Sequence, residues 1–96
     1  MLYNTIYIDQ VEKQKDIHGC EVITKVCYTT HKNLKATNWC TKKQMIMMIL
    51  TNPITVKTKY IKHGVWQEGA IVRVVDYQYL RTDSNYIKAD NLGELD

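Results

Sequence analysis

The chain has 96 residues, of which 45% are hydrophobic and 24% are charged, and its formal net charge is +3. These values exclude a disordered polyelectrolyte and predict one globular domain with a single core. The longest apolar run, residues 45–50, is too short to cross a membrane, and the first residues lack the basic and apolar regions of a secretion leader. We therefore expect a cytoplasmic protein that does not contact a membrane.

The first half of the chain predicts mainly strands. Alternating apolar and polar side chains indicate a strand over residues 2–8, and a run rich in β-branched residues indicates a second strand over residues 21–30. Residues 9–19 are polar and predict a loop, with a short helical turn as the alternative. A turn at residues 31–33 then leads into a shorter strand over residues 34–39.

One helix is predicted from its start and stop signals. Thr41 is a favourable N-cap, and Gln44 three residues later completes a capping box. The apolar run that follows forms a stripe along one side of a helix, and Asn52-Pro53 ends it. A helix of about ten residues is unstable alone, so we expect it to pack on a sheet.

The second half predicts strands over residues 54–61, 70–76 and 77–81, with a loop containing two glycines over residues 62–69. Strands and helix do not alternate along the chain, so a parallel sheet with regular crossover helices is not expected. The predicted fold class is α+β, with a small, curled antiparallel or mixed sheet of about five strands packed on one short helix.

Four short motifs carry a family resemblance. They are Ile23-Thr24-Lys25-Val26, Thr41-Lys42-Lys43, Tyr79-Leu80-Arg81 and Asp90-Asn91-Leu92-Gly93-Glu94-Leu95. From residue 21 onward the chain resembles the small bacterial proteins grouped as domain of unknown function 3892. Members often have proline after the final leucine, where this chain has Asp96. The resemblance implies a family-like domain over residues 21–96, leaves residues 1–20 as an N-terminal extension, and implies no particular activity.

The cysteines predict reduced thiols. Cys20, Cys27 and Cys40 are odd in number, and no secretion signal accompanies them. The alternative is a metal site that joins Cys20 and Cys27 to His18 and His31, but these spacings do not match the paired ligands of structural zinc sites. Phosphate-loop, nucleophile-elbow and two-histidine helix motifs are missing from the sequence as well. We expect no metal, no cofactor and no enzymatic activity.

The last residues combine turn formers with regularly placed apolar side chains. We expect them to form a lid, in which Leu92 and Leu95 cap one end of the sheet and Arg81 pairs with Asp83 or Asp90. The residues assigned to this lid are Arg81, Asp83, Asn85, Asp90, Asn91, Leu92 and Leu95. The alternative is a polar ligand site in which two of the carboxylates perform acid–base chemistry beside the arginine.

Positive charge is concentrated in the middle of the chain. From Val22 to Gln67 there are eight lysines and no aspartate or glutamate. The strand phases place five basic residues opposite the apolar stripes, on one exposed sheet face: Lys25, Lys35, Lys57, Lys59 and Arg73. Such a face, with tyrosines beside it, would bind nucleic acid by phosphate contacts and base stacking. The alternative is a solvated face that resists edge-to-edge aggregation.

Tyr60, Trp66 and Tyr79 are the candidate partner-contact residues, because tyrosine and tryptophan are enriched in interfaces. The leading hypothesis is a small non-enzymatic interaction module that binds a protein partner or a second copy of itself. The alternative is a nucleic-acid-binding protein that uses the basic sheet face. Neither the identity of the partner nor the oligomeric state follows from the sequence.

Overall fold

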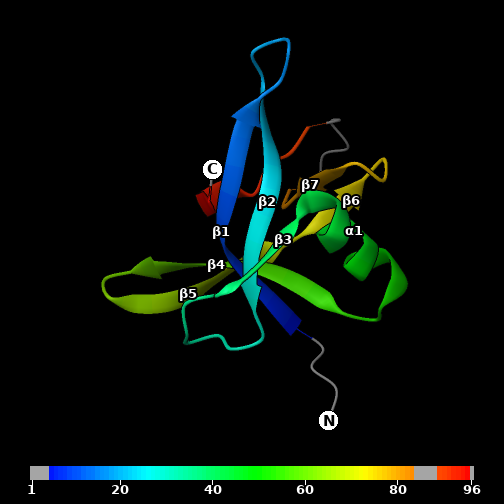
Figure 1. Cartoon of the computed structure of the whole chain (residues 1–96). Helices are drawn as coiled ribbons and strands as arrows, with labels where there is room; N and C mark the ends of the chain where they lie inside the picture. Colours follow the sequence, from blue (N-terminus) through cyan, green and yellow to red (C-terminus); the bar gives the residue numbers. More distant parts are fainter. Residues whose placement is uncertain (1–4, 84–88, 96) are drawn as a thin grey trace.

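The computed structural model describes residues 5–83 and 89–95 of the chain (Figure 1). Within these residues, seven strands, one α-helix and one short 3-10 helix follow one another. They are β1 (Thr5–Lys15), β2 (Glu21–Thr29), β3 (Asn38–Thr41), α1 (Lys42–Thr51), β4 (Thr55–Lys62), β5 (Val65–Ile71), β6 (Arg73–Val75), β7 (Tyr79–Arg81) and η1 (Gly93–Leu95).

The main sheet has five strands in the order β3-β2-β1-β4-β5, and β6 and β7 form a separate two-stranded sheet. All pairs are antiparallel except β1 and β4, which run parallel with Thr5 opposite Thr55. Parallel neighbours need a crossover connection, and here β2, β3 and α1 supply it. The predicted α+β class with one helix packed on a mixed sheet is confirmed.

The core lies between one face of the main sheet and the elements packed on it. Figure 1 shows α1 and the β6–β7 hairpin on the same side of the long β1–β2 hairpin, while η1 packs against β1 and β4. The cluster of buried side chains combines residues of β1, β2, β4, α1 and β7 with one residue before β6 and one before η1. It contains Ile6, Ile8, Ile23, Val26, Met45, Ile46, Val56, Val72, Leu80 and Leu92.

The helix forms as its sequence signals predict. The hydroxyl of the N-cap Thr41 accepts a hydrogen bond from the backbone N–H of Gln44 at 3.1 Å, and the Gln44 side chain accepts one from the Thr41 backbone N–H at 2.9 Å. Asn52 caps the other end through its backbone N–H, which donates to the Met48 carbonyl. Met45 and Ile46 face the core, whereas Met47 and Leu50 remain about half exposed, at 52% and 47%.

The predicted loop over residues 9–19 is wrong, because β1 continues to Lys15 and only residues 16–20 turn the chain. The outer half of β1 is polar and is held by pairing with β2, with register shifts near Asp9 and Thr24 that break the regular alternation of side chains. β1 lies between β2 and β4 in the main sheet. The segment expected to be an N-terminal extension therefore supplies a central strand, except for residues 1–4, which lie outside the described residues.

The predicted loop over residues 62–69 is also wrong. His63 and Gly64 make a two-residue turn with φ values of 54° and 77°, and β5 follows at once. Two residues with positive φ suffice for a tight hairpin. The strand expected over residues 70–76 is divided between the end of β5 and β6. The strand expected over residues 34–39 begins only at Asn38 and continues to Thr41.

Candidate functional site

The five basic residues predicted to share one exposed face do not do so. Lys59 is completely buried, and its Nζ donates hydrogen bonds to the carbonyls of His31 at 2.9 Å and Lys32 at 3.1 Å, and to that of Leu34. Lys57 lies on the same strand two residues away and forms an ion pair of 3.5 Å with Glu68.

The remaining three basic residues lie apart from this pair. Arg73 belongs to the second sheet, and its Nε donates to the Asp83 carbonyl at 2.9 Å. Lys25 and Lys35 are exposed, on β2 and in the segment that follows it. Lys57 and Lys59 lie on the same face of β4, as the alternation of side chains predicted. However, the segment of residues 30–37 covers that face of the sheet. The alternation of side chains along a strand cannot predict that another segment will cover it.

The covering segment is held by two buried charged side chains, Lys59 and Asp9. The Asp9 carboxylate accepts a hydrogen bond of 2.7 Å from the backbone N–H of Ala36, and both residues are buried. The Lys59 ammonium also lies 4.2 Å from the ring centre of Trp66 and 5.9 Å from that of Tyr7. Desolvation lowers the pKa of Lys59, and the nearby Asp9 charge partly opposes this effect. Asp9 was not among the predicted site residues, because its neighbours predicted a loop.

The three predicted partner-contact residues are not brought together. Tyr60 and Trp66 belong to the β4–β5 hairpin, and Ile61 rather than Tyr60 lies opposite Trp66, so the two rings face opposite sides of the sheet. Tyr79 belongs to β7 in the second sheet. All three are half-buried, and the Tyr79 ring is already covered by the Lys42 ammonium, which lies 5.6 Å from its centre.

The tail residues occupy structural positions. Leu92 is fully buried in the core and Leu95 packs against it. Arg81 is buried, and its Nη2 lies 2.7 Å from Asp83 Oδ2 in an ion pair. The Asn91 backbone joins the second sheet through a parallel bridge to Arg81, while Asn85 lies outside the described residues.

Asp90 connects the tail to three other elements. Its carboxylate accepts hydrogen bonds from the backbone N–H groups of Ile23 at 3.0 Å and Leu80 at 2.9 Å, and from Lys42 Nζ at 2.9 Å. A single side chain thus links the tail to β2, β7 and the first turn of α1. Buried polar groups of this kind are normally fully paired, and this one leaves little acceptor capacity for a ligand.

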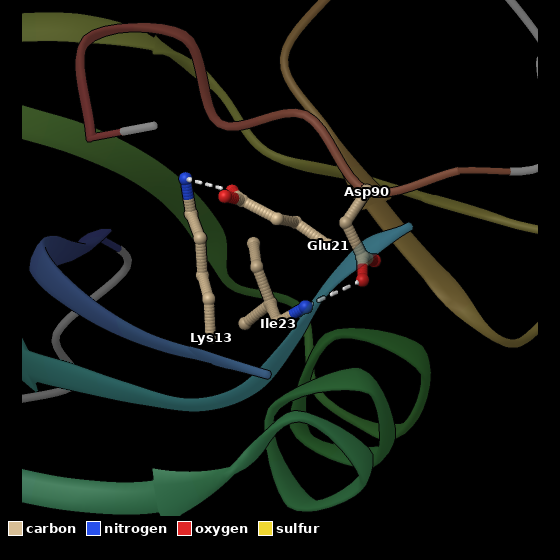
Figure 2. A pocket seen from close by; sticks show the side chains of 4 residues that line it. All are labelled: Lys13, Glu21, Ile23 and Asp90. Carbon is tan, nitrogen blue, oxygen red and sulfur yellow. Dashed lines mark hydrogen bonds and ion pairs between the residues drawn. The ribbon is translucent and has the colours of Figure 1, made fainter. Parts of the chain in front are cut away.

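A pocket of about 210 Å³ lies beside Asp90 and is lined by Lys13, Glu21, Ile23 and Asp90. Figure 2 shows the Asp90 side chain directed at the Ile23 backbone, and the Lys13 ammonium directed at the Glu21 carboxylate, 3.7 Å away. The charged groups of the pocket therefore bind one another or the backbone. The two tail carboxylates of the acid–base alternative have separate partners, with Asp83 on Arg81 and Asp90 on Lys42.

Metal-ligating side chains do not gather in the described part of the chain, where groups of three or more His, Cys, Asp or Glu side chains are absent. Cys20 is exposed, Cys27 is buried and Cys40 is half-buried. Burial raises the pKa of the Cys27 and Cys40 thiols. Since the thiolate is the reactive form, these two cysteines are poor nucleophiles.

The main sheet has two open edges, β3 and β5. β3 has only four residues and leads directly into α1. β5 has seven residues, and the β4–β5 hairpin extends to one side of the molecule, away from α1 (Figure 1). Val65 and Ile71 on β5 are 57% and 53% exposed, and Ile61 on β4 is 59% exposed. β5 is therefore the longer of the two terminal strands of the main sheet.

Comparisons with protein-family models, curated proteins and solved structures found no match to this chain. The resemblance to the domain of unknown function 3892 family therefore stays a prediction. Of the helices within residues 5–83 and 89–95, none has the length and apolarity needed to span a membrane.

Proposed function

We propose that this protein is a small interaction module that associates with a second copy of itself by strand pairing at the β5 edge. The observation that carries the proposal is the length and openness of this edge. Alternate residues of an antiparallel edge strand direct their N–H and C=O groups away from the sheet. A long edge strand with apolar residues is a template for another strand.

The composition of β5 favours self-pairing. The strand has no lysine, arginine or proline, the residues that commonly block such an edge. Its one charged residue, Glu68, accepts a hydrogen bond of 2.9 Å from the Tyr7 hydroxyl and pairs with Lys57. Because the negative charge is compensated within its own chain, two β5 edges approach each other with little like-charge repulsion.

A bulge limits how much of the edge can pair. The β4–β5 register shifts between Lys57 and Lys59, where Gly69 lies against Thr58 so closely that an added Cβ would overlap the Thr58 hydroxyl. Bulges bend a strand and interrupt its ladder. We therefore expect the pairing to be weak and to centre on Val65–Glu68, the half of β5 nearest the hairpin turn.

Sedimentation velocity of the purified chain over a range of concentrations tests this proposal. The chain is expected to shift from monomer to dimer as concentration rises, and the double variant Val65→Lys/Ile71→Lys is expected to remain monomeric. The double variant Met47→Lys/Leu50→Lys is a matched control, because it makes the same change at helix residues of similar exposure, 52% and 47%. A wild-type chain that stays monomeric throughout, or two double variants that behave alike, would contradict the proposal.

A further inference from the structure

A separate hollow of about 360 Å³ opens between the first turns of α1 and the β6–β7 hairpin. The strands and helix that form this hollow do not include β5. Lys42, Lys43 and Ile46 of α1 line one side, and Tyr77 and Gln78 of the β6–β7 turn line the other. Ile46 is 4% exposed, so the hollow has a buried apolar floor. Its volume falls within the range of small-molecule sites.

Tyr77, which lines this hollow, lies in an unfavourable turn. Asp76 and Tyr77 both have positive φ, at 54° and 57°, and the Gln78 N–H donates to the Val75 carbonyl at 3.1 Å, which closes a β-turn within the three-residue loop that joins β6 to β7. Such turns strongly favour Asn-Gly or Asp-Gly, and a bulky residue with positive φ is a conformational outlier. The turn nevertheless carries a tyrosine, which is 78% exposed.

Positive charge lies opposite this ring. Lys43 is exposed and forms no salt bridge with any carboxylate of the described residues, and the first turn of α1 carries no acidic residue. The Lys42 ammonium is already bound to Asp90 and lies over the Tyr79 ring, so it adds positive electrostatic potential to the hollow rather than a free hydrogen-bond donor. The exposed carboxylate of Asp76 precedes Tyr77 in the turn and is the charge that opposes an anion here.

We propose that this hollow binds a nucleotide, that is, a heteroaromatic base joined to a phosphate. An aromatic ring stacks on any base without sequence preference, and a lysine supplies a point charge for phosphate. The Gln78 amide can donate to and accept from a base edge, and the apolar floor covers the base from below. A free mononucleotide and one unit of a single strand present the same chemistry. The inference does not depend on self-association at β5.

Titration of the isotope-labelled chain with adenosine monophosphate, followed by amide chemical shifts, tests this inference. Saturable shifts are expected at Lys43, Tyr77 and Gln78, with weaker binding of adenosine and of inorganic phosphate alone. A single-stranded oligoadenylate that binds more tightly, with a steeper salt dependence than the mononucleotide, would identify a strand as the source of the ligand. Equal affinities would identify the free nucleotide. Absence of saturable shifts at these amides with both the mononucleotide and the oligonucleotide would overturn the inference.

Three variants separate binding from folding. Tyr77→Gly removes the stacking ring and at the same time restores a favoured turn, so it is expected to raise the unfolding midpoint while weakening nucleotide binding about tenfold. Lys43→Gln is expected to weaken binding about fivefold, whereas Lys62→Gln, at an exposed lysine at the end of β4, is expected to leave it unchanged. A Tyr77→Gly variant that binds as tightly as the wild type would exclude this hollow as the site.

Discussion

At the scale of single residues, Lys59 has a demanding environment, because its charged side chain is fully buried. A fully buried ammonium normally requires a carboxylate partner, yet this one is satisfied by carbonyls of the covering segment and by the faces of two aromatic rings. Those carbonyls belong to residues 31–34, which lie between β2 and β3 and are part of neither a strand nor a helix. The lysine therefore fixes a loop, and the loop in turn keeps the lysine away from water.

Replacing Lys59 with methionine tests this interdependence. We expect Lys59→Met to lower the free energy of unfolding by about 2–3 kcal/mol, because several carbonyls lose their donor at once. Lys57→Met is the matched control on the same strand, and it should cost no more than about 1 kcal/mol, because its ion pair is partly exposed. Urea unfolding at neutral pH measures both. If Lys59→Met is as mild as Lys57→Met, the carbonyls do not depend on the ammonium.

At the scale of elements, the sequence predicted α1 well because its signals are local. A capping box and an Asn-Pro stop act within a few residues, and the structure has both ends of the helix as predicted. The outer half of β1 and the first half of β5 were predicted as loops. The former is polar and depends on pairing with β2, and the latter follows a His-Gly turn that lacks the usual Asn-Gly or Asp-Gly pair.

The candidate sites were predicted less well, for a related reason. The alternation of side chains along β4 places Lys57 and Lys59 on one face of the sheet. It does not predict that residues 30–37 fold over that face. The hollow at Tyr77 joins residues about thirty positions apart in the sequence, and neither lysine nor tyrosine carries a motif that marks the pairing. In the tail, two leucines among turn formers predicted a cap on the core, and the structure has Leu92 buried in the core with Leu95 packed against it.

One side-chain hydrogen bond links two strands of the sheet, and its contribution to stability depends on pH. The Tyr7 hydroxyl on β1 donates to Glu68 on β5, which lowers the pKa of Glu68 from its ordinary value of 4.5 and raises the pKa of Tyr7 from 10.0. The contribution of Glu68 to the free energy of unfolding is complete above the pKa that Glu68 has in the unfolded chain, and it is lost as pH falls through the lower pKa of the folded chain. The contribution of Tyr7 is complete below the pKa that Tyr7 has in the unfolded chain, and it is lost as pH rises through the higher pKa of the folded chain.

Tyr7→Phe isolates this bond, because it removes the hydroxyl and keeps the ring beside Lys59. We expect the variant to be less stable than the wild type by under about 1 kcal/mol near neutral pH, since the bond is exposed. The difference should become smaller below the folded pKa of Glu68 and again above that of Tyr7. Urea midpoints of the two chains across this pH range measure it, and a difference that is independent of pH would assign the effect to packing.

At the scale of the whole molecule, β1 determines whether the main sheet exists. It pairs with β2 on one side and with β4 on the other, and its Ile6 and Ile8 enter the core. Without it, β2–β3 and β4–β5 would be two separate hairpins, and isolated hairpins are marginally stable at best. The parallel β1–β4 contact also joins residues about fifty positions apart, which is the kind of long-range pairing that slows folding.

A chain of residues 16–96 is therefore expected not to fold, even though it contains all of residues 21–96, the segment for which the sequence predicts a family resemblance. Its amide spectrum should lack native dispersion, and addition of a peptide of residues 5–15 should restore it by supplying the missing strand. The same peptide with Ile6→Asp and Ile8→Asp is the control, because both side chains are at most 7% exposed and a buried unpaired carboxylate is costly. Native dispersion of residues 16–96 alone would show that β1 is an accessory strand and that β2–β3 and β4–β5 find another way to share the core.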